Sequence, residues 1–174
     1  ILGAVGIAAA EGLVIPLVFN TGGYDSVATL KLLDGIVDIY MPDFKFWAPR
    51  VAEAICQARD YPEIARSALT EMHRQVGDLI IDETGVARKG LLIRHLVLPN
   101  GMAGTRSIMR FIAREISTRC YVNIMPQYRP CGRAAEIRGL DTFPSPADYR
   151  NALQAAKKEG ITRLDQPRRT FALR

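Results

Sequence analysis

Short apolar runs alternate along the chain with longer segments whose apolar residues recur every three or four positions. Compact apolar runs bounded by Gly and Pro are typical of buried strands, and the longer periodic segments are typical of amphipathic helices. The runs predict strands at residues 13–19, 36–42, 91–98 and 121–125. The periodic segments predict helices at residues 1–11, 26–33, 49–58, 62–76, 105–117 and 147–158.

Strands and helices that alternate in this order predict an α/β fold, because parallel neighbouring strands need right-handed crossovers and helices supply them. A small hairpin is expected around Thr84 and Gly85, and a last short strand at residues 162–164. The chain has 174 residues. That length can bury a core but is short of the roughly 250 residues of a complete eight-stranded barrel. We expect one domain over residues 1–165.

Asp43 and Lys45 are a conspicuous polar pair, since they directly follow the strand predicted at 36–42. Residues two apart on an extended chain point to the same side, so a carboxylate and an ammonium emerge together at this strand end. Such a pair can bind a zwitterionic or polar ligand. The same two residues can also form an ordinary ion pair that ties the strand end to its neighbour.

Polar residues follow the carboxyl ends of the other predicted strands as well. Parallel strands bring these ends to one edge of the sheet, which is where such folds place their binding sites. The residues expected at this rim, besides Asp43 and Lys45, are Asn20, Thr21, Asn100, Gln127, Tyr128 and Arg129. The amino ends of the strands carry Gly12, Gly35 and Gly90 instead. The sequence therefore predicts a site at the carboxyl rim.

Composition and charge narrow the classes of partner. Lys and Arg number 23 against 18 Asp and Glu, which gives a net charge of +5. Apart from a basic tail at residues 166–174, the charges are interspersed, so neither a basic stripe nor an aromatic RNA-binding signature is present. Residues 1–19 are apolar but lack a basic leader and are interrupted at Glu11. We expect a cytoplasmic protein that binds neither nucleic acid nor membranes.

Cysteines and histidines add little chemistry on their own. The three cysteines are Cys56, Cys120 and Cys131. Their wide spacing matches neither a disulfide framework nor a zinc or iron–sulfur motif, so we expect free thiols and no metal ligands. His95 lies in the strand at 91–98, where alternation places it and Arg94 on opposite faces, and we expect a hydrogen-bonded interior histidine. His73 lies on a helix and is assigned no chemistry.

Five separated segments carry a resemblance to a known family. They are NTGGYD at 20–25, YMPDFKFW at 40–47, MHRQVGDL at 72–79, RHLVLP at 94–99 and QYRP at 127–130. In this order they closely resemble the radical S-adenosylmethionine (SAM) proteins related to pyruvate formate-lyase activating enzyme. The resemblance extends from the start of the chain to about Asp165. It is specific, because five motifs occur in the family's order rather than one short pattern.

The resemblance implies a partial (β/α) barrel of the radical SAM type, truncated at its N-terminus. In this family of oxidoreductases, a [4Fe-4S] cluster reduces SAM to a 5′-deoxyadenosyl radical that abstracts hydrogen from a substrate. Asp43 and Lys45 match the Asp-x-Lys positions that help to hold SAM, and Met41 and Thr21 match positions near its polar end. Lys45 can neutralise the SAM carboxylate, and Asp43 can accept hydrogen bonds from ribose hydroxyls or lie beside a bound cation.

The chain departs from the family pattern at two of these contacts. The Asp that precedes the Thr of the first motif is Asn20 here, and the His that follows the fourth strand is replaced at Tyr128 and Arg129. Asn20, Gln127 and Tyr128 remain candidates for contact with the cofactor.

The largest departure concerns the iron–sulfur cluster. The family's Cys-x-x-x-Cys-x-x-Cys loop and its Gly-Gly-Glu segment, which grips the SAM amino group, do not occur in the 174 residues. The resemblance then implies the carboxyl-terminal part of a radical SAM enzyme, which alone holds no [4Fe-4S] cluster and is inactive. Its implied partners are an electron donor and a substrate, either a protein of the glycyl-radical type or a small molecule.

Two other interpretations remain open. In one, Lys45 is the amine nucleophile of a Schiff-base lyase built on a barrel, and Asp43 tunes its protonation. In the other, the chain is a non-catalytic remnant that binds a partner through open strand edges.

Overall fold

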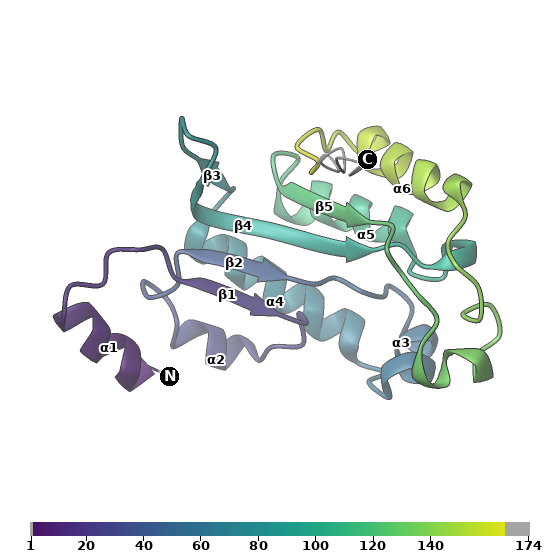
Figure 1. Cartoon of the computed structure of the whole chain (residues 1–174), viewed down its shortest axis with the longest axis horizontal. Coiled ribbons are helices and arrows are strands. Elements are labelled where there is room, and N and C mark those ends of the chain that lie inside the picture. The colour runs from purple at the N-terminus through teal and green to yellow at the C-terminus, as the bar shows by residue number, and fades with distance from the viewer. Residues whose placement is uncertain (1, 166–174) are drawn as a thin grey trace, which may run out of the picture.

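The computed structural model describes residues 2–165, which contain one five-stranded sheet (Figure 1). Four parallel strands are adjacent in the order β1, β2, β4, β5. Their bounds are β1 Val18–Thr21, β2 Ile39–Pro42, β4 Ala87–Leu96 and β5 Tyr121–Met125. The short β3, Ile80–Ile81, pairs antiparallel with the start of β4 and forms the expected hairpin. The predicted basic tail lies outside the described residues.

Helices connect the parallel strands and gather on one face of the sheet (Figure 1). In this view α4 Tyr61–Val76 and α5 Thr105–Phe111 lie behind the sheet, and α2 Val27–Lys31, below β1, packs against α4. A π turn, η2 at Ile112–Ile116, continues α5, and α6, Pro146–Lys158, packs against α5. The other elements are α1 Leu2–Ala10, α3 Pro49–Cys56, η1 Pro99–Gly101 and η3 Gly132–Glu136. The alternating α/β fold with a parallel sheet is confirmed.

The two faces of the sheet differ because the helices cover only one of them. Along β4, Leu91, Ile93 and His95 are buried on the helix side, whereas Leu92 and Arg94 between them are half-buried. Such alternation is expected of a strand with one covered face. The opposite placement of Arg94 and His95 is confirmed. We call the half-buried side of the sheet the open face.

The first strand lies later in the sequence than its apolar run predicts. The run covers residues 13–19, but β1 begins only at Val18. Pro16 has no N–H for a sheet ladder, and the Leu17 N–H donates at 2.8 Å to the Asp38 side chain instead of a neighbouring strand. Apolar composition alone therefore misplaced this strand by several residues.

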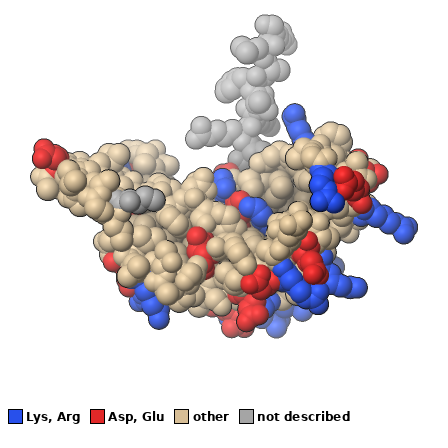
Figure 2. Space-filling model, turned by 90° about the horizontal axis from the view of Figure 1, so that it is seen from below, with Lys and Arg blue, Asp and Glu red and all other residues tan. Residues whose placement is uncertain are grey.

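On the face shown in Figure 2, Lys and Arg lie beside Asp and Glu mainly toward the lower edge and the right. The arm at the left, where Figure 1 places α1, is almost without charge. Within residues 2–165, no helix combines the length and the apolar composition that a bilayer crossing requires.

His95 is wholly buried, and both of its ring nitrogens have a hydrogen-bonding partner. Nδ1 lies 2.8 Å from the Phe44 carbonyl oxygen, and Nε2 lies 2.8 Å from the Thr105 hydroxyl. A carbonyl can only accept, so Nδ1 carries the proton and Nε2 accepts from Thr105. Burial lowers the pKa of His95 to about 4, which keeps the ring neutral. The expected interior histidine is confirmed.

Acidification should destabilise the fold through His95. The unfolded chain binds a proton near the ordinary pKa of 6.5 and the folded chain only near 4. The contribution to stability is therefore complete above pH 6.5 and is lost as the pH falls to about 4. At 1.36 kcal/mol per unit of pKa, we expect the free energy of unfolding to fall by up to about 3 kcal/mol. Urea titrations at successive pH values measure this fall.

The control is His95→Asn, whose amide can still donate to Phe44 but does not titrate. Carboxyl groups titrate in the same pH range, but they do so in both proteins. Subtracting the pH dependence of the variant from that of the wild type therefore removes the contribution of the carboxyl groups. Equal pH dependence in the wild type and the variant would show that His95 does not set the acid stability.

Candidate functional site

Asp43 lies between two cations at the carboxyl end of β2. Its Oδ2 is 3.0 Å from Lys45 Nζ, and its Oδ1 is 2.8 Å from Arg94 Nε and 2.7 Å from Arg94 Nη2. The side chains are 18% exposed for Asp43, 26% for Arg94 and 39% for Lys45. The ion pair between Asp43 and Lys45 is therefore present, and Arg94 adds a second cation. Together the three groups carry a net positive charge, which favours contact with an anionic group of a ligand.

One acceptor position on Asp43 stays open within this group. A carboxylate has about four lone-pair sites. Arg94 uses two on Oδ1 and Lys45 uses one on Oδ2. Oδ2 can therefore accept from one more donor, such as a hydroxyl, without loss of either ion pair.

The Tyr61 hydroxyl fixes the backbone beside these charges. It lies 2.9 Å from the carbonyl oxygens of Gly22 and Asp43 and accepts from the Lys45 N–H at 2.9 Å. Burial raises the pKa of Tyr61, so the hydroxyl keeps the proton that it donates. Gly23 has a φ of +79°, and a Cβ there would overlap the Asp43 carbonyl oxygen. The glycine turn is thus required for close approach to the end of β2.

A pocket of about 380 Å³ opens beside Lys45, at the carboxyl ends of β4 and β5. Its apolar wall is formed by Phe46, Ile55, Leu96, Leu98, Ile137 and Leu140. The charged groups that line it are Lys45 and Arg133. An apolar pocket with a few cations suits a ligand that has an apolar body and an anionic end.

Three predicted residues lie on β1 and β2. Asn20 and Met41 are register partners, and Met41 precedes Asp43 by two positions on the same face. Thr21 Oγ1 donates at 2.6 Å to Asp25 and accepts from the Gly23 N–H at 3.3 Å, so Thr21 stabilises the local turn.

The predicted residues that follow β4 and β5 do not all line the same pocket. Tyr128 lines the pocket, and its hydroxyl donates at 2.7 Å to the Leu140 carbonyl, which holds the segment that closes the pocket. Gln127 is exposed just beyond β5. Asn100, in η1 beyond the carboxyl end of β4, lines a separate hollow against α6 and not the pocket beside Lys45.

Several residues of the site carried weak signals or none in the sequence. Arg94 was predicted only to face the opposite side of its strand from His95, and nothing in the sequence linked it to Asp43. Cys56 and Cys131 both line the pocket, although they come from α3 and from the segment after β5. Cys120 is buried at the start of β5, at the opposite end of the sheet, so the three thiols do not share one site.

Comparison with known proteins gives one informative match. The chain is 32% identical over 148 residues to the uncharacterized protein MJ0674 of Methanocaldococcus jannaschii. The aligned region covers 84% of this chain but only 39% of that protein. No family model and no solved structure matches the chain. The comparison therefore assigns neither a family nor an activity.

Removal of the Tyr61 hydroxyl should destabilise the protein. Tyr61→Phe leaves the Lys45 N–H and two carbonyl groups without this partner, and an unsatisfied buried group costs about 1–3 kcal/mol. Chemical unfolding of the two proteins measures the difference.

Tyr24→Phe is a matched control, because Tyr24 stacks on Tyr61 but is 48% exposed and bonds Asp60 at the surface. We expect a loss of less than about 0.5 kcal/mol for this variant, as is usual for a surface change. Similar losses for both variants would contradict the role given to the Tyr61 hydroxyl.

Proposed function

We propose that the chain is the carboxyl-terminal part of a radical SAM protein and contributes the surface that holds the nucleoside and carboxylate of SAM. The observation that carries the proposal is the position of Lys45. Its ammonium lies at an apolar pocket of adenosine-compatible volume and 3.0 Å from Asp43, which retains an open acceptor. The five motifs of the sequence support the same family.

The chemistry of SAM agrees with this arrangement. Its carboxylate is an anion for Lys45, and its ribose hydroxyls are donors for Oδ2 of Asp43. Its adenine is a flat apolar ring, for which the wall around Leu96 and Leu98 offers contact. In this assignment, Tyr128 contributes to the wall and keeps its hydroxyl bond to Leu140.

The residues of this chain do not fit the other part of the family's cofactor, the [4Fe-4S] cluster. Cys56 and Cys131 lie at the pocket and Cys120 at the opposite end of the sheet, so they cannot bind one cluster together. We therefore propose no step of radical chemistry on this chain alone. The electron donor and the protein or small-molecule substrate likewise belong to the proposal for a complete protein.

The Schiff-base interpretation has less support. A Schiff-base lysine attacks as the neutral amine. Lys45 instead pairs with a carboxylate, which is the arrangement of a lysine that acts through its charge. Trapping with borohydride and a carbonyl substrate tests this second interpretation directly.

Binding of SAM should depend on Lys45. In saturation-transfer NMR with the 174-residue chain, we expect the adenine protons of SAM and of 5′-methylthioadenosine to receive saturation. Lys45→Met should weaken the binding of SAM by about 1.5–3 kcal/mol, which is the range for a hydrogen bond to a charged group. It should leave 5′-methylthioadenosine unchanged, because this ligand lacks the carboxylate.

Lys89→Met is the matched control, since Lys89 is an exposed lysine of the same sheet at the amino end of β4. It should bind both ligands like the wild type. The assignment of the site would be overturned if neither ligand received saturation, or if both lysine variants lost the same affinity for SAM.

Reconstitution should separate this chain from a complete radical SAM enzyme. With iron, sulfide and a reductant, we expect the 174-residue chain to form no stable cluster and to cleave no SAM, because its thiols are dispersed. Iron analysis and visible absorption measure the first expectation, and chromatography for 5′-deoxyadenosine measures the second. A stoichiometric [4Fe-4S] spectrum would show that the cysteines were misread.

A further inference from the structure

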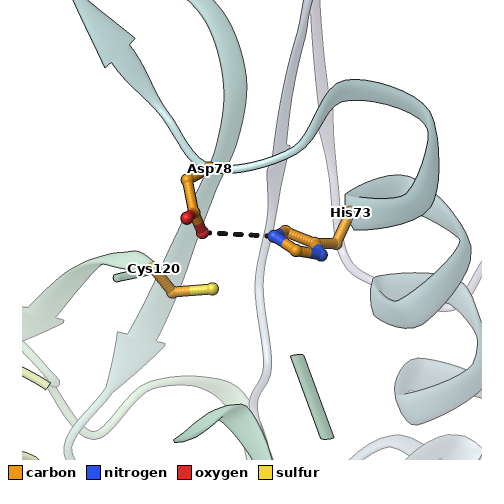
Figure 3. Close-up of side chains that lie close together, drawn as sticks. All are labelled: His73, Asp78 and Cys120. Atoms are coloured by element: carbon orange, nitrogen blue, oxygen red, sulfur yellow. Dashed lines mark hydrogen bonds and ion pairs between the residues drawn. The ribbon is translucent and has the colours of Figure 1, made fainter. Parts of the chain in front are cut away.

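Three side chains with metal-binding atoms meet at the amino end of the sheet, opposite the candidate site (Figure 3). His73 comes from the last turn of α4, Asp78 from the link between α4 and β3, and Cys120 from the residue before β5. Their nitrogen, oxygen and sulfur atoms all lie within 4.8 Å of one another. Within the described residues, this is the one group of three such ligands that close together.

The geometry is near to that of a bound metal ion. His73 Nε2 lies 3.1 Å from Asp78 Oδ1, as the dashed line of Figure 3 shows, and the Cys120 thiol faces the same space. Ligands at ~2.0–2.3 Å from zinc lie roughly 3.3–3.7 Å apart in a tetrahedron. Shifts of about an ångström in the side chains would bring the three atoms to these separations.

Neighbouring groups hold the Asp78 carboxylate in a suitable orientation. Its Oδ2 accepts from the Ser117 hydroxyl at 3.3 Å and pairs with Arg119 Nε at 3.2 Å, which leaves Oδ1 toward His73. Outer contacts of this kind are typical of metal-ligating carboxylates. His73 and Asp78 are 24% and 17% exposed, so an ion can reach them from solvent.

Cys120 is the buried member of the group and also packs in the hydrophobic core. Its thiol is free and wholly buried, and its sulfur lies within 4.8 Å of the ligand atoms of His73 and Asp78. A bound divalent cation displaces a thiol proton of this kind and neutralises the thiolate that forms.

We propose that His73, Asp78 and Cys120 form a binding site for Zn²⁺, with a water molecule as the fourth ligand. Nitrogen, oxygen and thiolate together are a donor set that zinc accepts, whereas Mg²⁺ and Ca²⁺ prefer oxygen alone. On binding, the Cys120 proton passes to solvent, and the proton that His73 Nε2 donates to Asp78 is exchanged through solvent for one on Nδ1. Bonds from Nε2 and Oδ1 to the metal then replace the hydrogen bond between His73 and Asp78.

The site joins α4 to the start of β5 at the end of the sheet where such folds place stability rather than chemistry. An ion that binds the folded chain and links these elements should raise the thermal stability of the chain. The inference is independent of the proposed SAM site, because it uses none of the same residues.

Replacement of zinc by Co²⁺ tests the site in the tag-free 174-residue chain. We expect one bound ion per chain, a thiolate-to-cobalt charge-transfer band in the near ultraviolet and the visible bands of a tetrahedral site. Addition of Zn²⁺ should abolish these bands and raise the melting temperature. Metal analysis after dialysis against Zn²⁺ should give the same stoichiometry.

Variants identify the ligands. The double variant Cys56→Ser/Cys131→Ser, which removes both exposed thiols, should keep the full spectrum. Cys120→Ala should lose the charge-transfer band. His73→Ala, at a partly exposed position that leaves the core intact, should weaken binding roughly tenfold or more. The proposal is overturned if the double variant lacks the charge-transfer band, or if His73→Ala binds Co²⁺ like the wild type.

Discussion

A hydrogen bond that β2 cannot make to β4 is the constraint on which the candidate site depends. Alternate residues of a strand face alternate neighbours: the Asp43 N–H donates to Thr21 of β1, and the Phe44 N–H donates to Arg94 of β4. Pro42 lies in position to face β4 but has no N–H to donate. The two strands therefore lack one ladder bond immediately before the rim where the polar residues gather.

Two consecutive side chains of β4 compensate, one on each face of the sheet. On the open face, the Arg94 guanidinium binds the Asp43 carboxylate, and on the helix face the His95 ring donates to the Phe44 carbonyl. The first bond is charge-assisted and the second is buried from water, so both are stronger than exposed neutral bonds. The contacts that join the ends of β2 and β4 are thus the same ones that orient Asp43 beside Lys45.

The alternation of apolar runs and helices predicted the parallel strands and the rim, because burial and crossover handedness act on segments that can be read locally. It could not give the register of one strand against another. Asp43 and Arg94 are 51 positions apart and meet only through the pairing of β2 with β4. His73 and Cys120 were dismissed for the same reason, since their proximity arises from packing rather than from spacing. The first strand was misplaced because apolar composition does not show where Pro16 breaks the ladder.

Asp43 and Lys45 differ in their other contacts, and this difference separates the ion-pair interpretation from the ligand interpretation. Asp43 also pairs with Arg94, so its replacement weakens the junction of β2 and β4 together with any ligand contact. Within the described residues, Lys45 Nζ bonds Asp43 alone and is the more exposed of the two. A change at Lys45 therefore leaves the junction in place and reports on ligand binding. The two interpretations are compatible, because Arg94 already balances the charge of Asp43 and leaves that of Lys45 available to an anion.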